Sequence, residues 1–424
     1  MNLFFIADIF LGRAAGIHRY SLEMARRLME DEEVRVKFVC VGEASINALD
    51  RRLRELFGQD TRIHDRRVMA GIEFDGRLLM QCTQLHEKLK LHIRAQKKSW
   101  LKPLREVLRV LRKIEESLLG LTHFRYGAPK PVLFSPYHAT GSLMQSRDNP
   151  FLVHVVHDVI PVIHPEYFEA NKGFHRIYAR LTEADLIITV SESTRQDLIN
   201  HHDAVEPERI HTVAIAASAH FQPVDGRSDL SRIRRKYGIP EDSDYILTLC
   251  TMEPRKNHLR LLEAWAKVVE KLELKSPKLV IAGGAGWGEG LQDGVHQALG
   301  NSDSIITTGY VDDDDLPLLY SGCAFSVYPS LYEGFGLPVL ESMKCGRFCL
   351  TSNVSSMPEI TGEDLPLVDP QDVDSIAAGI LNTANDTGRR KELEHRAIER
   401  AKLFSWDSCH RHTIHLIRAK AANP

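Results

Sequence analysis

The chain has 424 residues, 43% of them hydrophobic, which is enough for two domains with separate cores. Its formal net charge is only -3, so its overall charge gives no reason to expect a nucleic acid partner. Seven scattered cysteines form no C-x-x-C pair, which fits a reducing cytosol better than a disulfide or zinc framework. We expect a cytoplasmic protein, because no signal peptide precedes the first apolar run and no stretch approaches the roughly 18 apolar residues of a membrane span.

Short apolar runs alternate with segments of helical period along the chain, which is the spacing of repeated strand–helix–strand units. We therefore expect an α/β fold with parallel sheets. The predicted strands include 3–7, 34–41, 132–134, 152–156, 186–190, 245–249, 279–282 and 325–328.

The first predicted loop contains Gly12 and Gly16 and leads directly into a helix over 17–29. A glycine loop before a helix is weak evidence for a phosphate site when it stands alone. The basic residues around it can face a ligand or be solvated. They are Arg13, His18 and Arg19.

The segment Lys88–Lys113 has ten Lys or Arg residues against one acid, and its apolar residues recur at helical spacing. Such a basic amphipathic surface can lie on anionic lipid, each basic charge contributing about 1 kcal/mol. The alternative is a helix pair whose apolar stripe packs on its own domain. Both readings stay open, so peripheral attachment to the inner face of the plasma membrane is an option.

His157 and Asp158 follow the predicted strand 152–156, at the carboxyl end where α/β folds bind ligands. A histidine there can hydrogen-bond a sugar hydroxyl or another substrate group. His154 lies inside the strand, so we expect it in the core. Asp158 is a candidate for the same site, but it is explained equally well as a turn residue.

The alternation of apolar runs with helical segments is interrupted over 218–231, and we place a domain boundary after residue 222. The strand 245–249 then runs into a loop that ends in Arg255 and Lys256, before a helix that starts near His258. Two adjacent cations at a strand's carboxyl end can neutralise phosphates. Alternatively, the two side chains are solvated charges in a turn.

Four consecutive acids, Asp312 to Asp315, follow a predicted strand at 305–308 and the segment Gly309–Val311. They could hold a divalent ion, but they also suit the start of the helix that follows. We expect the helix start and no metal.

The stretch from Glu333 to Glu341 places two carboxylates eight positions apart around a Gly-Phe-Gly loop. The preceding apolar run predicts a buried strand, and Pro338 suits the first turn of a helix. Gly334 and Gly336 leave room for a phosphate to approach the N–H groups at the helix start. We expect Glu341 in the first helical turn, and both carboxylates can accept hydrogen bonds from hydroxyl groups.

This glutamate-x7-glutamate stretch resembles the signature of retaining glycosyltransferases of family four, and the similarity covers nearly the whole chain. The resemblance implies the GT-B fold, in which two Rossmann-like domains face a central cleft and the C-terminal helix crosses back to the N-terminal domain. The expected parts are an acceptor domain over 1–222 with a basic insertion at about 86–125, a donor domain over 223–404, and a C-terminal helix over 405–424.

In that family the second carboxylate holds the nucleotide ribose and the first contacts the transferred sugar, roles that fall to Glu341 and Glu333. The resemblance places His157 beside the donor sugar and Arg255 with Lys256 on the phosphates. Many members carry a glycine-arginine pair where this chain has Cys250 and Thr251. The residues expected to bind the donor nucleotide sugar are Gly16, Val311, Gly334, Phe335, Gly336, Leu337 and Glu341.

The motifs look most like those of bacterial mannosyltransferases of O-antigen or exopolysaccharide synthesis. We therefore expect a metal-independent, retaining hexosyltransferase with no cofactor, using GDP-mannose and a glycan or polyprenyl-linked acceptor. A UDP-sugar-dependent enzyme of the same fold is the main alternative. A nucleotide-sugar epimerase and a non-catalytic nucleotide-sugar-binding protein also stay open.

Overall fold

The computed structural model describes residues 1–7, 10, 16–39, 46–58, 61, 63–64, 130–137, 149–168, 178–272, 277–284, 286, 303–363 and 365–422. It divides by packing into two compact units. The first comprises Met1–Arg13, Leu28–Ser135 and Ala139–Leu152, and the second comprises Ala14–Arg27, Pro136–His138 and Val153–Pro424. The basic segment Lys88–Lys113 lies outside the described residues. The predicted boundary after residue 222 stays a prediction.

The first unit is built on parallel strands. These are β1 (Asn2–Ile6), β2 (Arg35–Val39), β3 (Ile63–His64) and β4 (Val132–Ser135), in the order β3-β2-β1-β4, with helix α2 (Ile46–Phe57) beside them. Leu3 to Ile6 in β1 are completely buried although successive side chains point to opposite faces. A strand covered on both faces reads as a continuous apolar run, which is why the sequence predicted it.

The second unit begins with helix α1 (Gly16–Glu30), of which residues up to Arg27 belong to it, and with further parallel strands. These strands are β5 (Phe151–Val156), of which the residues from Val153 belong to this unit, β6 (Leu186–Thr189) and β7 (Ile210–Thr212). Helices α6 (Ile160–Ile163) and α8 (Glu192–His201) and short 3₁₀ turns connect them. His154 is completely buried in β5, as expected.

A six-stranded parallel sheet forms the rest of this unit, in the order β10-β9-β8-β11-β12-β13. Its strands are β8 (Tyr245–Leu249), β9 (Lys278–Ala282), β10 (Ile305–Gly309), β11 (Phe325–Tyr328), β12 (Cys349–Ser352) and β13 (Leu367–Val368). Its helices are α9 (Arg227–Lys236), α10 (His258–Lys271), α12 (Leu316–Gly322), α13 (Leu337–Lys344), α14 (Met357–Thr361), α15 (Val373–Ala384) and α16 (Thr387–Ala401).

The strand order of this sheet reverses between β8 and β11, because β9 and β10 continue to one side while β12 and β13 continue to the other. The loops at the carboxyl ends of two such strands leave toward opposite sides and open a crevice between them, where α/β folds bind ligands. Two predicted segments therefore meet here. The loop from Cys250 to Lys256 follows β8, and the loop from Pro329 to Gly336 follows β11.

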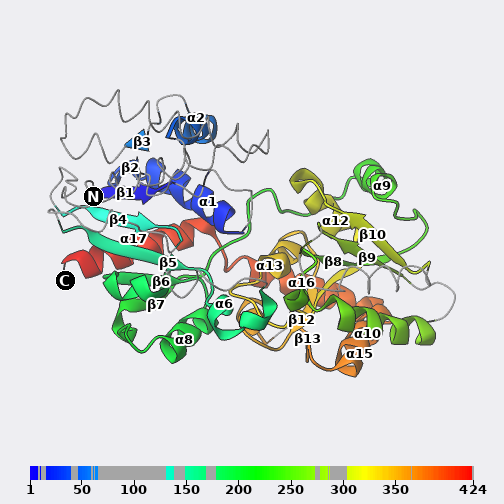
Figure 1. Ribbon diagram of the computed structural model, residues 1–424. Coiled ribbons are helices and arrows are strands. Elements are labelled where there is room, and N and C mark those ends of the chain that lie inside the picture. Colours follow the sequence, from blue (N-terminus) through cyan, green and yellow to red (C-terminus); the bar gives the residue numbers. More distant parts are fainter. Residues whose placement is uncertain are drawn as a thin grey trace, which may run out of the picture. The chain divides into compact units, whose positions relative to one another are not determined.

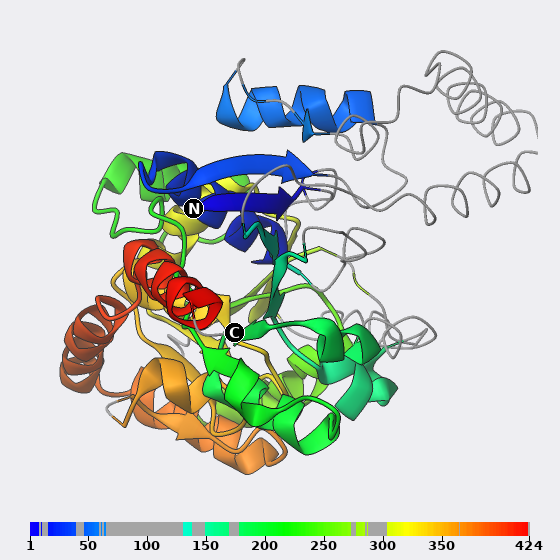
Figure 2. The same cartoon turned by 90° about the vertical axis from the view of Figure 1, so that its left-hand side faces the viewer.

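Helix α17 (Trp406–Ala422) packs on segments from the N-terminal half of the chain (Figure 1 and Figure 2). The ring of Trp406 lies 5.9 Å from that of Tyr20 in α1, and Arg27 Nε donates to Asp407 Oδ1 at 2.8 Å. Lys420 Nζ donates to the carbonyl of Glu208. Within the described residues, no helix combines the length and apolar character needed to cross a bilayer.

Asn257 fixes the junction between the β8 loop and α10. It is buried and adopts a left-handed conformation with φ of 64°. Its Nδ2 donates to the carbonyls of Pro329 at 3.0 Å and Pro370 at 2.6 Å, so one side chain joins loops after three strands.

We expect Asn257→Ala to lower the free energy of unfolding by about 2–4 kcal/mol, because it leaves buried carbonyls unpaired and places alanine in a left-handed conformation. Asn257→Gly removes the same amide, but glycine adopts the left-handed conformation without strain. We therefore expect it to lower the free energy of unfolding by about 1 kcal/mol less than Asn257→Ala does. Chemical denaturation of both variants measures the difference. Equal stability of Asn257→Ala and the parent protein would show that these hydrogen bonds do not hold the junction.

Candidate active site

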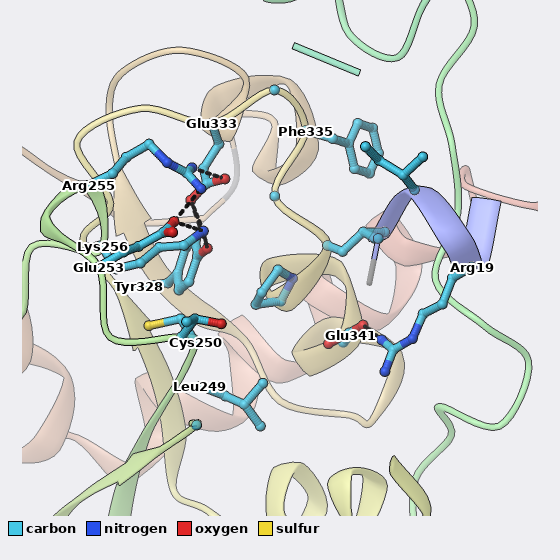
Figure 3. Close-up of a pocket in the computed structure, with 18 of the residues that line it drawn as sticks. Arg19, Leu249, Cys250, Glu253, Arg255, Lys256, Tyr328, Glu333, Phe335 and Glu341 are labelled. Atoms are coloured by element: carbon cyan, nitrogen blue, oxygen red, sulfur yellow. Dashed lines mark hydrogen bonds and ion pairs between the residues drawn. The ribbon is translucent and has the colours of Figure 1, made fainter. Parts of the chain in front are cut away.

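A cavity of about 540 Å³ lies in the second unit at the crevice between the β8 and β11 loops (Figure 3). The start of α1, the loops after β5, β9 and β10, and the first turns of α13 complete its walls. Gly12 and Arg13 of the predicted glycine loop lie outside the described residues. Eleven other residues predicted for the site line this one cavity. They are Gly16, His157, Arg255, Lys256, Val311, Glu333, Gly334, Phe335, Gly336, Leu337 and Glu341.

Glu333 lies at the centre of a hydrogen-bonded cluster on one side of the cavity. Its Oε1 accepts from Lys256 Nζ at 2.6 Å, and its Oε2 pairs with Arg255 Nη1 at 2.5 Å. Tyr328 and Ser330 donate their hydroxyls to the same Oε1 at 2.8 and 2.7 Å. Glu333 is only 7% exposed, so these partners replace the water that an ionised group needs.

Glu253 supplies a second carboxylate to this cluster. Its Oε1 lies 2.5 Å from Arg255 Nη2 and 3.7 Å from Lys256 Nζ. Two carboxylates therefore balance two cations. Burial alone would favour the neutral form of Glu333, but the charges of Arg255 and Lys256 outweigh it and lower its pKa to about 2. Glu333 is therefore ionised at neutral pH.

Glu341 lies on another side of the cavity, where Figure 3 shows it beside Arg19 of α1. Arg19 Nη1 donates to Glu341 Oε1 at 2.8 Å, and Tyr320 donates its hydroxyl to Oε2 at 3.3 Å. Glu341 is 3% exposed. This burial raises its pKa to about 7, although Arg19 acts in the opposite direction.

The prediction that Glu341 lies in the first helical turn is wrong. Helix α13 begins at Leu337 with Pro338 in its first turn, so Glu341 is its fifth residue and lies in the second turn. Gly336 precedes the helix with φ of 106°, a left-handed conformation that glycine adopts without strain. The carboxylate therefore reaches the cavity from the side of the helix rather than from its N-terminus.

The glycine loop before α13 is fixed by side chains from other segments. Ser191 and Thr194, at the start of α8, donate to the carbonyl of Gly334 at 2.6 and 3.1 Å. Ser356 donates to the carbonyls of Glu333 and Phe335 at 3.0 and 2.7 Å. These contacts hold the loop in one conformation beside the cavity.

Gly334 also needs to be glycine, since a Cβ atom there would lie 2.0 Å from the carbonyl oxygen of His157. We expect Gly334→Ala to lower the free energy of unfolding by about 1–3 kcal/mol and to reduce activity, because the β5 and β11 loops must separate. Gly284→Ala is the control, as its Cβ would have nothing within 4 Å. Thermal unfolding compares the two. If both alanines behave alike, the close approach does not matter for stability.

His157 lines the cavity with its ring held by the backbone. Its Nε2 lies 2.8 Å from the carbonyl of Pro136, which can only accept, so Nε2 carries a proton and Nδ1 is the acceptor in the neutral ring. Burial lowers the pKa of His157 to about 4. Asp158 also lines the cavity and accepts from the N–H of Ile160, which is the predicted turn role.

The four acids after β10 start a helical segment as expected, but they do not cap it with their side chains. Asp313 to Asp315 form a 3₁₀ turn before α12, and neither Asp312 nor Asp315 makes a capping hydrogen bond. Lys236 Nζ instead bonds Asp312 at 2.7 Å and Asp315 at 2.5 Å, while Arg19 Nη2 bonds Asp313 at 2.9 Å.

Several lining residues were missed by the sequence reasoning. Glu253 could have been noticed as an acid next to two cations, and Gly283 and Gly284 as glycines directly after strand β9. A Cβ on Gly283 would lie 1.9 Å from the carbonyl oxygen of Cys250, so this glycine lets the β8 and β9 loops touch. Tyr328 belongs to strand β11, and no feature of the sequence indicates that its side chain lines a site.

Comparison with known proteins identifies the family. Residues 229–404 match the sequence profile of "Glycosyl transferases group 1". The "O-antigen chain mannosyltransferase B" of Escherichia coli is 36% identical over 261 residues, which are 61% of this chain and 68% of that protein. The chain belongs to glycosyltransferase family four. The "Serotype-specific mannosyltransferase WbdA" of Escherichia coli is 34% identical over 260 residues, and this chain covers 31% of its length.

Solved structures confirm the GT-B fold that the sequence predicted. Anabaena HepE in complex with UDP and glucose superposes with a TM-score of 0.66 at 16% identity, covering 99% of this chain and 100% of that chain. WaaG, a glycosyltransferase involved in lipopolysaccharide biosynthesis, has a TM-score of 0.61 at 14% identity, with 98% and 99% covered. The protein is thus a glycosyltransferase of the GT-B type, and its family acts with a nucleotide-sugar donor and a glycan acceptor.

Proposed function

We propose that the protein is a retaining mannosyltransferase that transfers mannose from GDP-mannose to a glycan or polyprenyl-linked acceptor in cell-surface polysaccharide synthesis. The observation that carries the proposal is one cavity with two chemically different sides: the Arg255 and Lys256 cations beside Glu333, and the buried carboxylate Glu341. The names of the relatives support the choice of mannose and of O-antigen synthesis.

The donor would occupy this cavity along its length. Glu341 would accept from the ribose hydroxyls, the backbone at Val311 would contact the base, and the Gly334–Leu337 loop would approach the diphosphate through its N–H groups. Lys256 Nζ has three N–H donors, and Tyr328 and Glu333 accept two of them. The third can donate to a phosphate oxygen without breaking the cluster.

Glu333 would accept from hydroxyls of the transferred sugar. Its charge is held in place by Arg255 and Lys256, so the same ion pairs that stabilise the leaving phosphate also orient the carboxylate. His157 supports this arrangement, because its neutral ring offers Nδ1 as an acceptor toward a sugar hydroxyl.

The proposed chemistry is front-face substitution at the anomeric carbon. The bond between this carbon and the diphosphate oxygen breaks, and its electron pair stays on the phosphate, where Lys256 and Arg255 stabilise the new charge. The acceptor hydroxyl attacks from the same face and passes its proton to the departing phosphate oxygen. No cofactor or metal enters these steps, because the cations and the loop amides carry the phosphate charge.

A panel of nucleotide sugars tests the proposal, with release of nucleoside diphosphate measured with and without a polyprenyl-linked mannosyl acceptor. We expect acceptor-dependent release of GDP from GDP-mannose, and a product whose early NMR spectrum shows the donor's anomeric configuration. Release from UDP-sugars only would overturn the donor. Interconversion of free donor without acceptor would indicate an epimerase, and binding without release a non-catalytic nucleotide-sugar-binding protein.

A further inference from the structure

Arg19 joins two carboxylates of the cavity that lie far away in the sequence. Its Nη1 lies 2.8 Å from Glu341 Oε1 and its Nη2 lies 2.9 Å from Asp313 Oδ1. The guanidinium carbon also lies 5.8 Å from the centre of the Phe221 ring. Three groups from different segments therefore fix one side chain, and Arg19 itself lines the cavity (Figure 3).

Glu341 needs such a partner to act as an acceptor. It is 3% exposed, and burial raises its pKa, so without a nearby positive charge the carboxylate would tend to take up a proton and lose acceptor sites. An ionised carboxylate offers about four lone-pair sites. Arg19 and Tyr320 use one on each oxygen, which leaves sites for two hydroxyl groups.

We propose that Arg19 is a positioning residue for the donor nucleotide, which acts through Glu341 by pairing with its carboxylate and holding it turned toward the ribose. This inference rests on the proposed function, since it takes Glu341 as the ribose acceptor. It assigns a role in donor recognition to the first helix of the chain.

Two other roles of Arg19 make different predictions. A guanidinium that leaves Glu341 to bind the donor phosphates would be insensitive to the ribose hydroxyls. A purely structural ion pair would change the stability of the protein and not its selectivity between nucleotides.

The test compares GDP with 2′,3′-dideoxy-GDP, using calorimetric dissociation constants for the parent protein and Arg19→Gln. We expect Arg19→Gln to weaken GDP binding about tenfold and to weaken dideoxy-GDP binding less than about twofold. The reason is that Arg19 acts through the hydrogen bonds between Glu341 and the ribose hydroxyls, which dideoxy-GDP lacks. Arg19→Lys should restore part of the loss, since lysine keeps the charge but not the two-pronged geometry.

Arg27→Gln is the matched control. Arg27 lies two turns further along α1, has nearly the same side-chain exposure (23% against 24%) and also pairs with two carboxylates, Glu23 and Asp407. It does not line the cavity. We expect it to change thermal stability without changing the ratio of the two dissociation constants.

Equal losses for both nucleotides in Arg19→Gln would overturn the inference, as would no loss for either. If Arg19→Gln does not fold, the same two dissociation constants are measured for Arg19→Lys. A larger loss of affinity for GDP than for dideoxy-GDP would then support the inference. A parent protein that binds neither GDP nor UDP would instead contradict the proposed function. If the parent protein binds UDP but not GDP, the same comparison is made with UDP and 2′,3′-dideoxy-UDP.

Discussion

We expect Lys256→Ala to lower kcat by about 10²–10³-fold while changing the affinity for the donor much less. Lys256 Nζ is held by Glu333 Oε1 and the Tyr328 hydroxyl, both at 2.6 Å, at an exposure of only 11% for its side chain. A charge fixed in a site of low dielectric stabilises the departing diphosphate more than it stabilises the bound donor. Steady-state release of GDP at saturating donor measures the effect.

Lys267→Ala is the control for this variant. Lys267 lies in α10, which follows the same loop, and pairs with Asp374 on the surface. It should retain full turnover. A Lys256→Ala enzyme with parental kcat would show that this cation takes no part in leaving-group stabilisation. Arg255 is the less clean choice for this experiment, because its Nη1 also donates to the carbonyl of Tyr332 and its loss would disturb the loop.

The second large effect is a pH dependence of nucleotide binding that comes from Glu341. Its pKa is raised to about 7, so the carboxylate is ionised above this pH and becomes protonated as the pH falls through it. If only the ionised form accepts the ribose hydroxyls, the GDP association constant should fall about tenfold between pH 8 and pH 6. Calorimetry across this range provides the measurement.

Tyr320 and Cys345, which face Glu341, do not share this transition. Both stay protonated because burial raises the pKa of each. Asp313 interacts with Glu341 through its charge. The variant Glu341→Gln should bind GDP more weakly at pH 8, by about 10–100-fold, and should lose the pH dependence that remains after titration of the phosphate itself is subtracted. An unchanged pH profile in this variant would assign the transition to another group.

Much of the fold followed from the sequence because the central parallel strands are covered on both faces. The runs at 245–249 and 325–328 are apolar except for Thr248 and Ser326 for this reason, and the structure makes them β8 and β11. The β8 and β11 loops meet because the strand order reverses between these two strands. That order is set by pairing in three dimensions, so the sequence placed each loop at a strand's carboxyl end but could not show that they are neighbours.

The partners of the site residues were harder to predict than the residues themselves. Arg19 and Glu341 are 322 positions apart, and no local pattern distinguishes an arginine that will meet a buried carboxylate from a solvated one. The same holds for Ser191, which reaches Gly334 across 143 positions. Glu341 was expected in the first turn of helix α13, but the helix starts at Leu337, so Glu341 is its fifth residue and lies just inside the second turn.

A crystal structure of the protein with GDP tests the central claim most directly. It should show the ribose hydroxyls within hydrogen-bond distance of Glu341, with Arg19 still on Oε1, and the β-phosphate beside Lys256 Nζ and the N–H groups of the Gly334–Leu337 loop. GDP bound outside this cavity, or in it with the ribose away from Glu341, would contradict the account.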